Sequence, residues 1–137
     1  MINLFSDWIG DYVTALQNAG RYNKDYHLKS IKFVDELLEK LPNSDTRMIN
    51  KAITLKGEGL FKLGERDKAD RLFEDYVSHQ SDQFDVYFEW ANLYNPELGS
   101  IAEDKEKSIQ LYRKALDCAG SDWDREVAKD WLYELMN

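Results

Sequence analysis

Histidine and cysteine, the side chains that most often carry enzyme chemistry, are few and far apart in this chain of 137 residues. The histidines are His27 and His79, and the single cysteine is Cys118. A recognisable zinc site needs several Cys or His residues at short spacings, as in H-E-x-x-H, and no such set occurs. One cysteine also excludes an internal disulfide. The sequence therefore predicts no metal site and no cofactor.

The surroundings of these residues in the sequence do not favour catalysis. A nucleophilic cysteine needs a histidine or a cluster of bases that stabilises its thiolate, and Cys118 has neither nearby. We predict that it is a half-buried apolar residue. His27 is expected in a loop region between helices. His79 is expected at a helix C-terminus, where it would interact favourably with the helix dipole.

Acidic residues and glycines likewise follow structural patterns. Asp122-x-Asp124 and Asp67-x-x-Asp70 are typical of helix caps and solvated helix faces. Gly57-x-Gly59 lies inside an apolar helical pattern, so it predicts close packing between helices and not a phosphate-binding loop. Together these patterns predict that the chain is not an enzyme.

The charge balance argues against a nucleic-acid partner. The chain has 26 acidic and 18 basic residues and a net charge of −8, which phosphate groups would repel. No apolar run approaches the ~18 residues of a membrane span, and the N-terminus has no secretory signal pattern. We therefore expect a cytoplasmic protein that binds neither nucleic acid nor membrane.

Helices must position all of these residues, because apolar side chains recur every three or four positions along the chain. Gly20 and Gly64 are predicted helix stops, and Asp82 and Ser121 are predicted N-caps. The fold class is predicted to be all-α, with about seven helices. They form three hairpins and a final helix, at about residues 4–42, 46–79, 83–119 and 122–136.

Three segments share one pattern at equal intervals of 39 residues. Ser30, Ala69 and Ser108 each begin the run small-x-x-apolar-apolar-x-x-apolar-apolar. A period between 20 and 50 residues indicates stacked supersecondary units. The three segments are the second helices of the hairpins, and the first helices do not keep the interval. The loops within the hairpins must therefore differ in length, and the final helix should cover the third hairpin.

The middle hairpin resembles a tetratricopeptide repeat (TPR). Gly57, Leu60, Gly64, Ala69 and Phe73 stand where that family places small, apolar, small, small and aromatic residues. The third hairpin resembles the slightly longer Sel-type variant, and the first hairpin is more divergent. The resemblance implies a short right-handed α-solenoid of three TPR-like hairpins, closed by a C-terminal capping helix, over residues 1–137 as one domain.

A narrower resemblance links two segments to the helical repeat regions of bacterial proteins that also carry a SEC-C zinc motif. The segments are Gly59-Leu60-Phe61-x-Leu63-Gly64-Glu65 and Phe84-x-x-Tyr87-x-x-Trp90-Ala91-x-Leu93-Tyr94. The SEC-C motif needs several cysteines, and this chain has one. No metal function carries over.

The TPR resemblance implies a concave groove, lined by the first helix of each hairpin, that binds a peptide. The positions that would line it are Asp11, Thr14, Lys51, Thr54, Leu55, Glu58, Lys62, Phe88, Asn92 and Asn95. Its acidic members oppose a clamp for a C-terminal carboxylate, so a neutral or mildly basic segment with an apolar anchor fits better. Phe88 is either the contact for that anchor or a residue that packs against a neighbouring helix.

These patterns favour a bacterial adaptor that binds a peptide or protein segment in a preorganised groove. Two alternatives stay open. One is a dedicated chaperone for a secreted or unstable client protein. The other is a homodimer formed through the C-terminal helix, with Trp123 and Trp131 partly in the interface.

Overall fold

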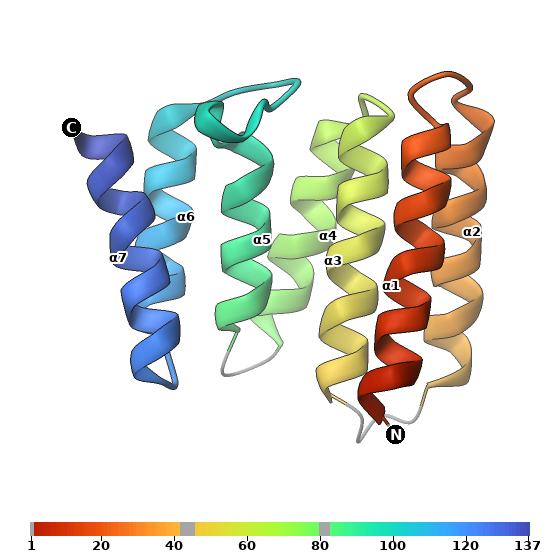
Figure 1. Cartoon of the computed structure of the whole chain (residues 1–137), viewed down its shortest axis with the longest axis horizontal. Helices are drawn as coiled ribbons and strands as arrows, with labels where there is room; N and C mark the ends of the chain where they lie inside the picture. Colours follow the sequence, from red (N-terminus) through yellow and green to blue (C-terminus); the bar gives the residue numbers. More distant parts are fainter. Residues whose placement is uncertain (1, 42–45, 80–82) are drawn as a thin grey trace. The chain divides into compact units, whose positions relative to one another are not determined.

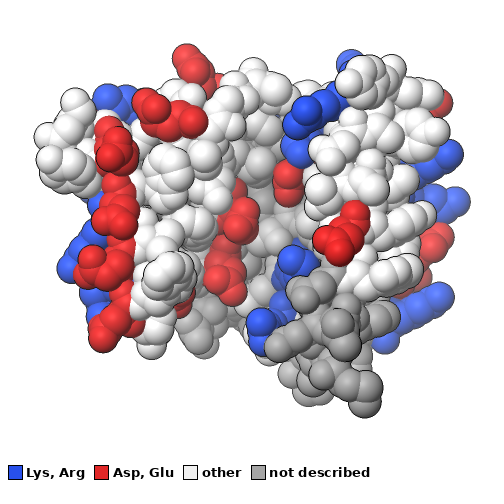
Figure 2. Space-filling view, in the orientation of Figure 1, with Lys and Arg blue, Asp and Glu red and all other residues white. Residues whose placement is uncertain are grey.

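The computed structural model describes residues 2–41, 46–79 and 83–137, and helices dominate all three ranges (Figure 1). The all-α prediction is confirmed. None of the helices in these ranges is both long and apolar enough to cross a membrane. Charged side chains are spread over the helix surfaces (Figure 2). In these ranges the helices are α1 (Ile2–Ala19), α2 (Asp25–Lys40), α3 (Thr46–Lys62), α4 (Arg66–Ser78), α5 (Phe84–Tyr94), the 3-10 helix η1 (Pro96–Leu98), α6 (Lys105–Asp117) and α7 (Asp122–Met136).

The chain divides into two compact units, Met1–Leu72 and Phe73–Asn137. The boundary between the units falls inside α4. The repeat pattern does not reveal this division. Ala69 and Phe73 lie on opposite sides of the boundary but belong to the same apolar stripe of one helix.

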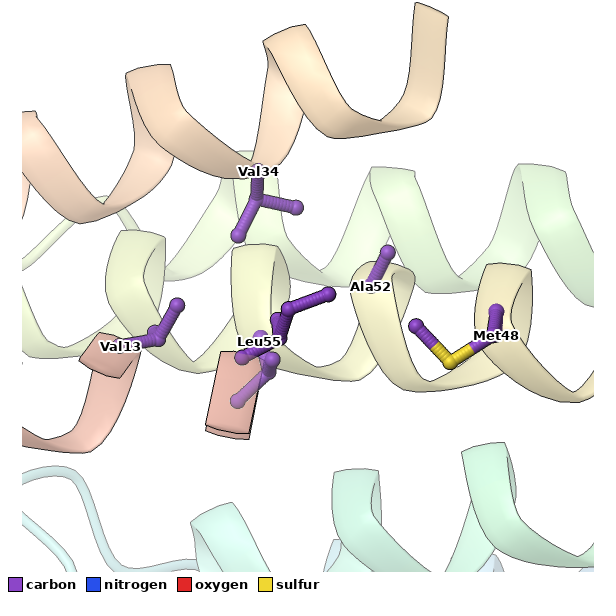
Figure 3. Close-up of a cluster of buried hydrophobic side chains, with 6 residues drawn as sticks. Val13, Val34, Met48, Ala52 and Leu55 are labelled. Atoms are coloured by element: carbon purple, nitrogen blue, oxygen red, sulfur yellow. The ribbon is translucent and has the colours of Figure 1, made fainter. Parts of the chain in front are cut away.

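The first unit is built on a core shared by α1, α2 and α3. Val13 of α1 and Val34 of α2 are completely buried, and they point toward Met48, Ala52 and Leu55 of α3 (Figure 3). Complete burial of one valine side chain stabilises the folded state by about 1.5–3 kcal/mol. The apolar stripes that predicted these helices are thus the surfaces that hold them together.

Small residues let α2 and α3 approach closely. A Cβ atom on Gly59 would lie 3.0 Å from Cγ1 of Ile31 and 3.3 Å from Oγ of Ser30. Ser30 is 1% exposed and opens the first copy of the 39-residue pattern. The close packing predicted for Gly57-x-Gly59 is therefore confirmed at Gly59. Gly64 ends α3 with φ of 86°, a conformation that favours glycine.

The second unit contains α5, α6 and α7. Phe73, at the end of α4 that belongs to this unit, stacks on Trp90 of α5 with 5.2 Å between ring centroids. The hydroxyl of Ser108, on α6, donates to the carbonyl of Ala91 at 3.0 Å, so a small residue again marks a close helix crossing. Ser121 caps α7 by accepting from the backbone N–H of Asp124 at 3.1 Å, as predicted. The predicted cap Asp82 lies outside the described residues.

Candidate functional site

In the first unit, the residues predicted to line a groove lie on α1 and α3. A Cβ on Gly10 would lie 3.1 Å from Cε of Lys51, and Nζ of Lys62 donates to Oε1 of Gln17 at 3.3 Å. Gly10 lies against Lys51, and Gln17, further along α1, lies against Lys62, further along α3. The two helices therefore run parallel, as the first helices of two stacked hairpins would. The α1–α3 face is the surface formed by Asp11, Thr14, Lys51, Thr54, Glu58 and Lys62.

A polar network fixes part of this face. Gln17 is 2% exposed, and its Nε2 donates to the carbonyl of Leu55 at 3.4 Å. Its Oε1 accepts from Lys62, which also forms an ion pair with Glu58 at 2.9 Å. The sequence prediction missed Gln17. The available signal was a polar residue one helical turn after the buried Val13.

The candidates on the α1–α3 face differ in accessibility. Asp11 and Thr14 are exposed, and the four candidates of the α1–α3 face on α3 are half-buried. The hydroxyl of Thr54 donates to the carbonyl of Lys51 at 2.8 Å and is therefore already engaged. Leu55 belongs to the apolar core with only 8% of its surface exposed. The sequence prediction that Leu55 lines a groove is therefore wrong. Leu55 belongs to the apolar stripe of α3, which faces the core.

An aromatic pair lies on α1 beside Asp11. Trp8 and Tyr12 are 58% and 43% exposed and stack with 5.9 Å between centroids and 5° between planes. Tyr12 also meets Phe33 of α2 edge to face at 4.9 Å. The pair therefore packs against α2 through Tyr12, although much of both rings is open to solvent.

In the second unit, the predicted asparagines belong to an internal network around Tyr112. Asn95 donates through Nδ2 to the hydroxyl of Tyr112 at 3.0 Å, and that hydroxyl donates to Oδ1 of Asn92. Tyr112 and Asn95 are completely buried, whereas Asn92 is half-buried. Burial raises the pKa of Tyr112 to about 12, so the phenol stays protonated and able to donate.

The amide of Asn95 is used at both ends. Its Oδ1 accepts from the backbone N–H of Glu97 at 2.9 Å and so caps η1. With no exposed surface, Asn95 cannot contact a peptide, which corrects its predicted role. The Asn-Pro sequence at positions 95 and 96 was the available signal, because it favours turn initiation.

Phe88 packs against a neighbouring helix, which is the second of its two predicted roles. It stacks on Phe84 at 5.4 Å and meets Tyr112 edge to face at 5.4 Å. It is half-buried against the core cluster of Phe84, Ala115 and Ala128. Cys118 packs against the same cluster and is half-buried, as predicted.

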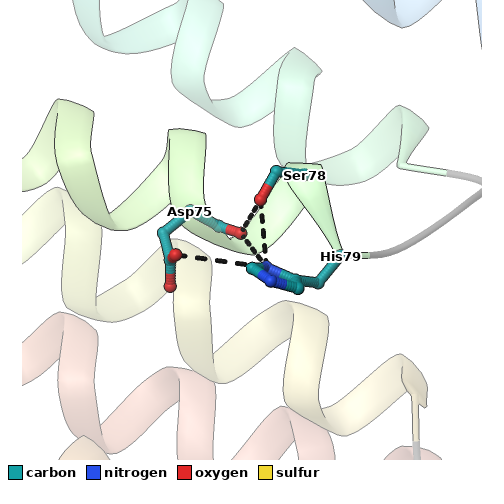
Figure 4. A network of polar contacts seen from close by, with 3 residues as sticks. All are labelled: Asp75, Ser78 and His79. Atoms are coloured by element: carbon teal, nitrogen blue, oxygen red, sulfur yellow. Dashed lines mark hydrogen bonds and ion pairs between the residues drawn. The ribbon is translucent and has the colours of Figure 1, made fainter.

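The end of α4 brings together serine, histidine and aspartate, the residue types of a hydrolase triad (Figure 4). Ser78 Oγ lies 3.0 Å from Nδ1 of His79, and the carbonyl and carboxylate oxygens of Asp75 lie 2.9 and 4.0 Å from the same nitrogen. A triad needs the serine and the carboxylate on opposite ring nitrogens. All three contacts here use one nitrogen at an exposed helix end, so the cluster caps α4, as predicted for His79.

His27 does not lie in a loop, as the sequence predicted, but in the first turn of α2. Its side chain is 4% exposed, and its Nδ1 has no hydrogen-bond partner within the described chain. Burial lowers the pKa of His27, and the charges of Lys62 and Lys24 lower it further. A Cβ on Gly20 would lie 2.5 Å from the imidazole ring. Gly20 after the α1 stripe therefore makes room for His27 as well as ending the helix.

The two tryptophans predicted for a dimer interface have different surroundings. Trp123 is 77% exposed. Trp131 is half-buried and stacks on Tyr112 within its own unit, at 6.3 Å between centroids. Trp131 therefore stabilises the unit, and of the two tryptophans Trp123 is the one that is largely exposed.

In the described part of the chain, no three His, Cys, Asp or Glu residues form a group able to hold a metal ion. Neither a protein-family model nor a curated protein nor a solved structure matches this chain. The resemblance to the TPR family stays a prediction from the sequence.

Proposed function

We propose that the chain is a non-catalytic protein-interaction module that binds a peptide or protein segment on α1 and the α1–α3 face. The observation that carries this proposal is the exposed, stacked pair of Trp8 and Tyr12 beside the exposed carboxylate of Asp11. Trp and Tyr are enriched among the residues that contribute most to binding at protein interfaces. An apolar side chain of the partner would lie on the rings, and a basic group beside Asp11.

The polar network around Gln17 supports the same proposal. It engages Lys62 and Glu58 with partners inside the chain before any partner protein arrives. A surface that is ordered in advance loses little conformational entropy on binding. The TPR-like pattern of the sequence agrees with this interpretation, since solenoid repeats present extended binding surfaces.

Site-specific photo-crosslinking in a native lysate tests the proposal. A photoreactive residue replaces the exposed Thr14 in one variant and the exposed Glu36, on α2, in a matched control. We expect one defined partner protein to crosslink at position 14 and not at position 36. Absence of a specific crosslink at position 14, or equal labelling at both positions, would contradict the proposal.

Two other outcomes identify the alternatives. A chaperone would crosslink at position 14 to a client whose solubility falls when this protein is removed. A homodimer through the C-terminal helix would give a concentration-dependent mass in light scattering without any added partner.

A further inference from the structure

The outer side of α7 carries a surface that the folding of the second unit does not explain. The buried side of this helix consists of Ala128, Leu132 and Leu135. The residues on the opposite side are all exposed, and the space-filling view shows a line of acidic side chains along α7 (Figure 2). The α7 outer face is the surface formed by Trp123, Glu126, Asp130, Tyr133 and Glu134.

Three carboxylates of this face form one row. Glu126, Asp130 and Glu134 are spaced four residues apart, so each lies directly above the next on the helix surface. Like charges at this spacing destabilise a helix by about 0.2–0.5 kcal/mol per pair. Within the described chain, none of the three carboxylates forms an ion pair.

The helix end adds to the negative potential. The last turn of α7 contains Glu134 and no basic residue, although the carbonyl end of a helix dipole favours cations. Five acidic and two basic side chains give α7 a net charge of −3. Arg125, one of the two bases, is held by Asp122 at 2.7 Å. A cationic partner would relieve the repulsion that the helix itself leaves in place.

Two aromatic side chains flank the acidic row. Trp123 is 77% exposed and Tyr133 is 68% exposed. They lie ten residues apart, which corresponds to about 15 Å along the helix axis. The two rings provide apolar anchors, and Glu126 and Asp130, which lie between them along the helix, provide orientation.

We propose that the α7 outer face docks a basic amphipathic helix of a partner protein. The partner helix would carry two apolar anchors about ten residues apart and Lys or Arg side chains between them on the same face. This inference rests on the proposal that the chain binds proteins, but it uses a different surface from α1 and the α1–α3 face.

A second copy of this chain fits the α7 outer face poorly. Two such faces would bring one acidic row against another, and the exposed base Lys129 lies only at the edge of the row. Trp131, the second tryptophan that a dimer would use, is already stacked on Tyr112. Charge complementarity therefore selects a basic partner.

Three synthetic helical peptides test this inference against the full chain. The first has leucine at two positions ten residues apart with lysines between them on one face. The second replaces these lysines with glutamate, and the third replaces the leucines with serine. Fluorescence anisotropy gives the dissociation constant for each, with wild type, with the double variant Trp123→Ala/Tyr133→Ala and with Asp130→Asn.

We expect only the first peptide to bind wild type well. The double variant should weaken it at least tenfold, and Asp130→Asn should weaken it several-fold with a shallower dependence on salt. Tyr22→Ala, which removes a ring that is 93% exposed elsewhere, should have no effect. All of the substituted side chains are exposed, so we expect every variant to fold. Thermal melting checks this expectation.

Several results would overturn the inference. Equal binding of the first and third peptides would show attraction by charge alone, and unchanged binding to the double variant would place the peptide elsewhere. A homodimer that Trp123→Ala dissociates would assign the face to a second copy. If the peptides fail while the partner crosslinked at position 14 still binds, the α7 inference is wrong and the proposed function stands.

Discussion

The hydroxyl of Tyr112 and the amide of Asn95 join α6 to the end of α5 inside the second unit. At the scale of single residues, such buried polar groups were the hardest feature to infer from sequence. Asn92 and Gln17 are polar residues inside apolar helical patterns, and Asn95 directly follows one. A one-dimensional pattern does not show which of the three find an internal partner. Family position suggested a surface for the two asparagines, whereas packing engages both with Tyr112 and buries Asn95.

Replacing Asn95 with alanine should therefore destabilise the second unit. It removes a donor to Tyr112 and the acceptor for the N–H of Glu97, and an unsatisfied buried group costs about 1–3 kcal/mol. Denaturant unfolding measures the change, and Asn18→Ala, at an exposed amide, should shift stability by less than about 0.5 kcal/mol. An Asn95→Ala variant as stable as wild type would contradict the structural role.

His27 should make the stability of the first unit depend on pH. Its folded-state pKa lies below 6.5, so the unfolded chain binds the proton more readily. The free energy of unfolding should consequently fall as the pH drops below about 6.5, until the folded-state pKa is reached. Unfolding of wild type and His27→Gln between pH 7.5 and 5 measures this contribution as a difference.

Wild type and His27→Gln share every other titratable group, so the difference between their two slopes reports His27 alone. An identical pH dependence of wild type and His27→Gln would show that the buried imidazole does not titrate as its surroundings require.

At the scale of elements, the helices could be predicted because their signals are local. Apolar periodicity, Gly64 at a positive φ and Ser121 at an N-cap act within one or two turns of chain. The pairing of helices was predicted less completely. It depends on where small residues meet, as Gly59 meets Ser30, and that requires knowledge of both helices at once.

A leucine at position 59 tests the close crossing of α2 and α3. Even a single Cβ there would lie 3.0 Å from Ile31, so the larger side chain must push the helices apart. We expect a loss of about 1–3 kcal/mol in the free energy of unfolding, as for other overpacked cores. Gly120→Leu is the control, because a Cβ at Gly120 meets no atom within 4 Å. Equal stability of the two variants would contradict the crossing.

At the scale of the whole molecule, the 39-residue interval predicted repeated helical packing but not the division into two units. Periodicity indicates which residues face a neighbouring helix, but it does not indicate how extensively successive hairpins pack against each other. The candidate surfaces were predicted in part. Thr14 and Asp11 are accessible as expected, whereas the aromatic pair of Trp8 and Tyr12 could be recognised only when its exposure was known.

The central claim is that the chain binds a protein segment through the ring pair of Trp8 and Tyr12. The most direct measurement is the dissociation constant of the partner crosslinked at position 14, for wild type and for Trp8→Ala/Tyr12→Ala. We predict a loss of about 30-fold, the effect of removing an interface anchor of about 2 kcal/mol, and no change for Tyr22→Ala. Equal affinity of wild type and the double variant would contradict the claim.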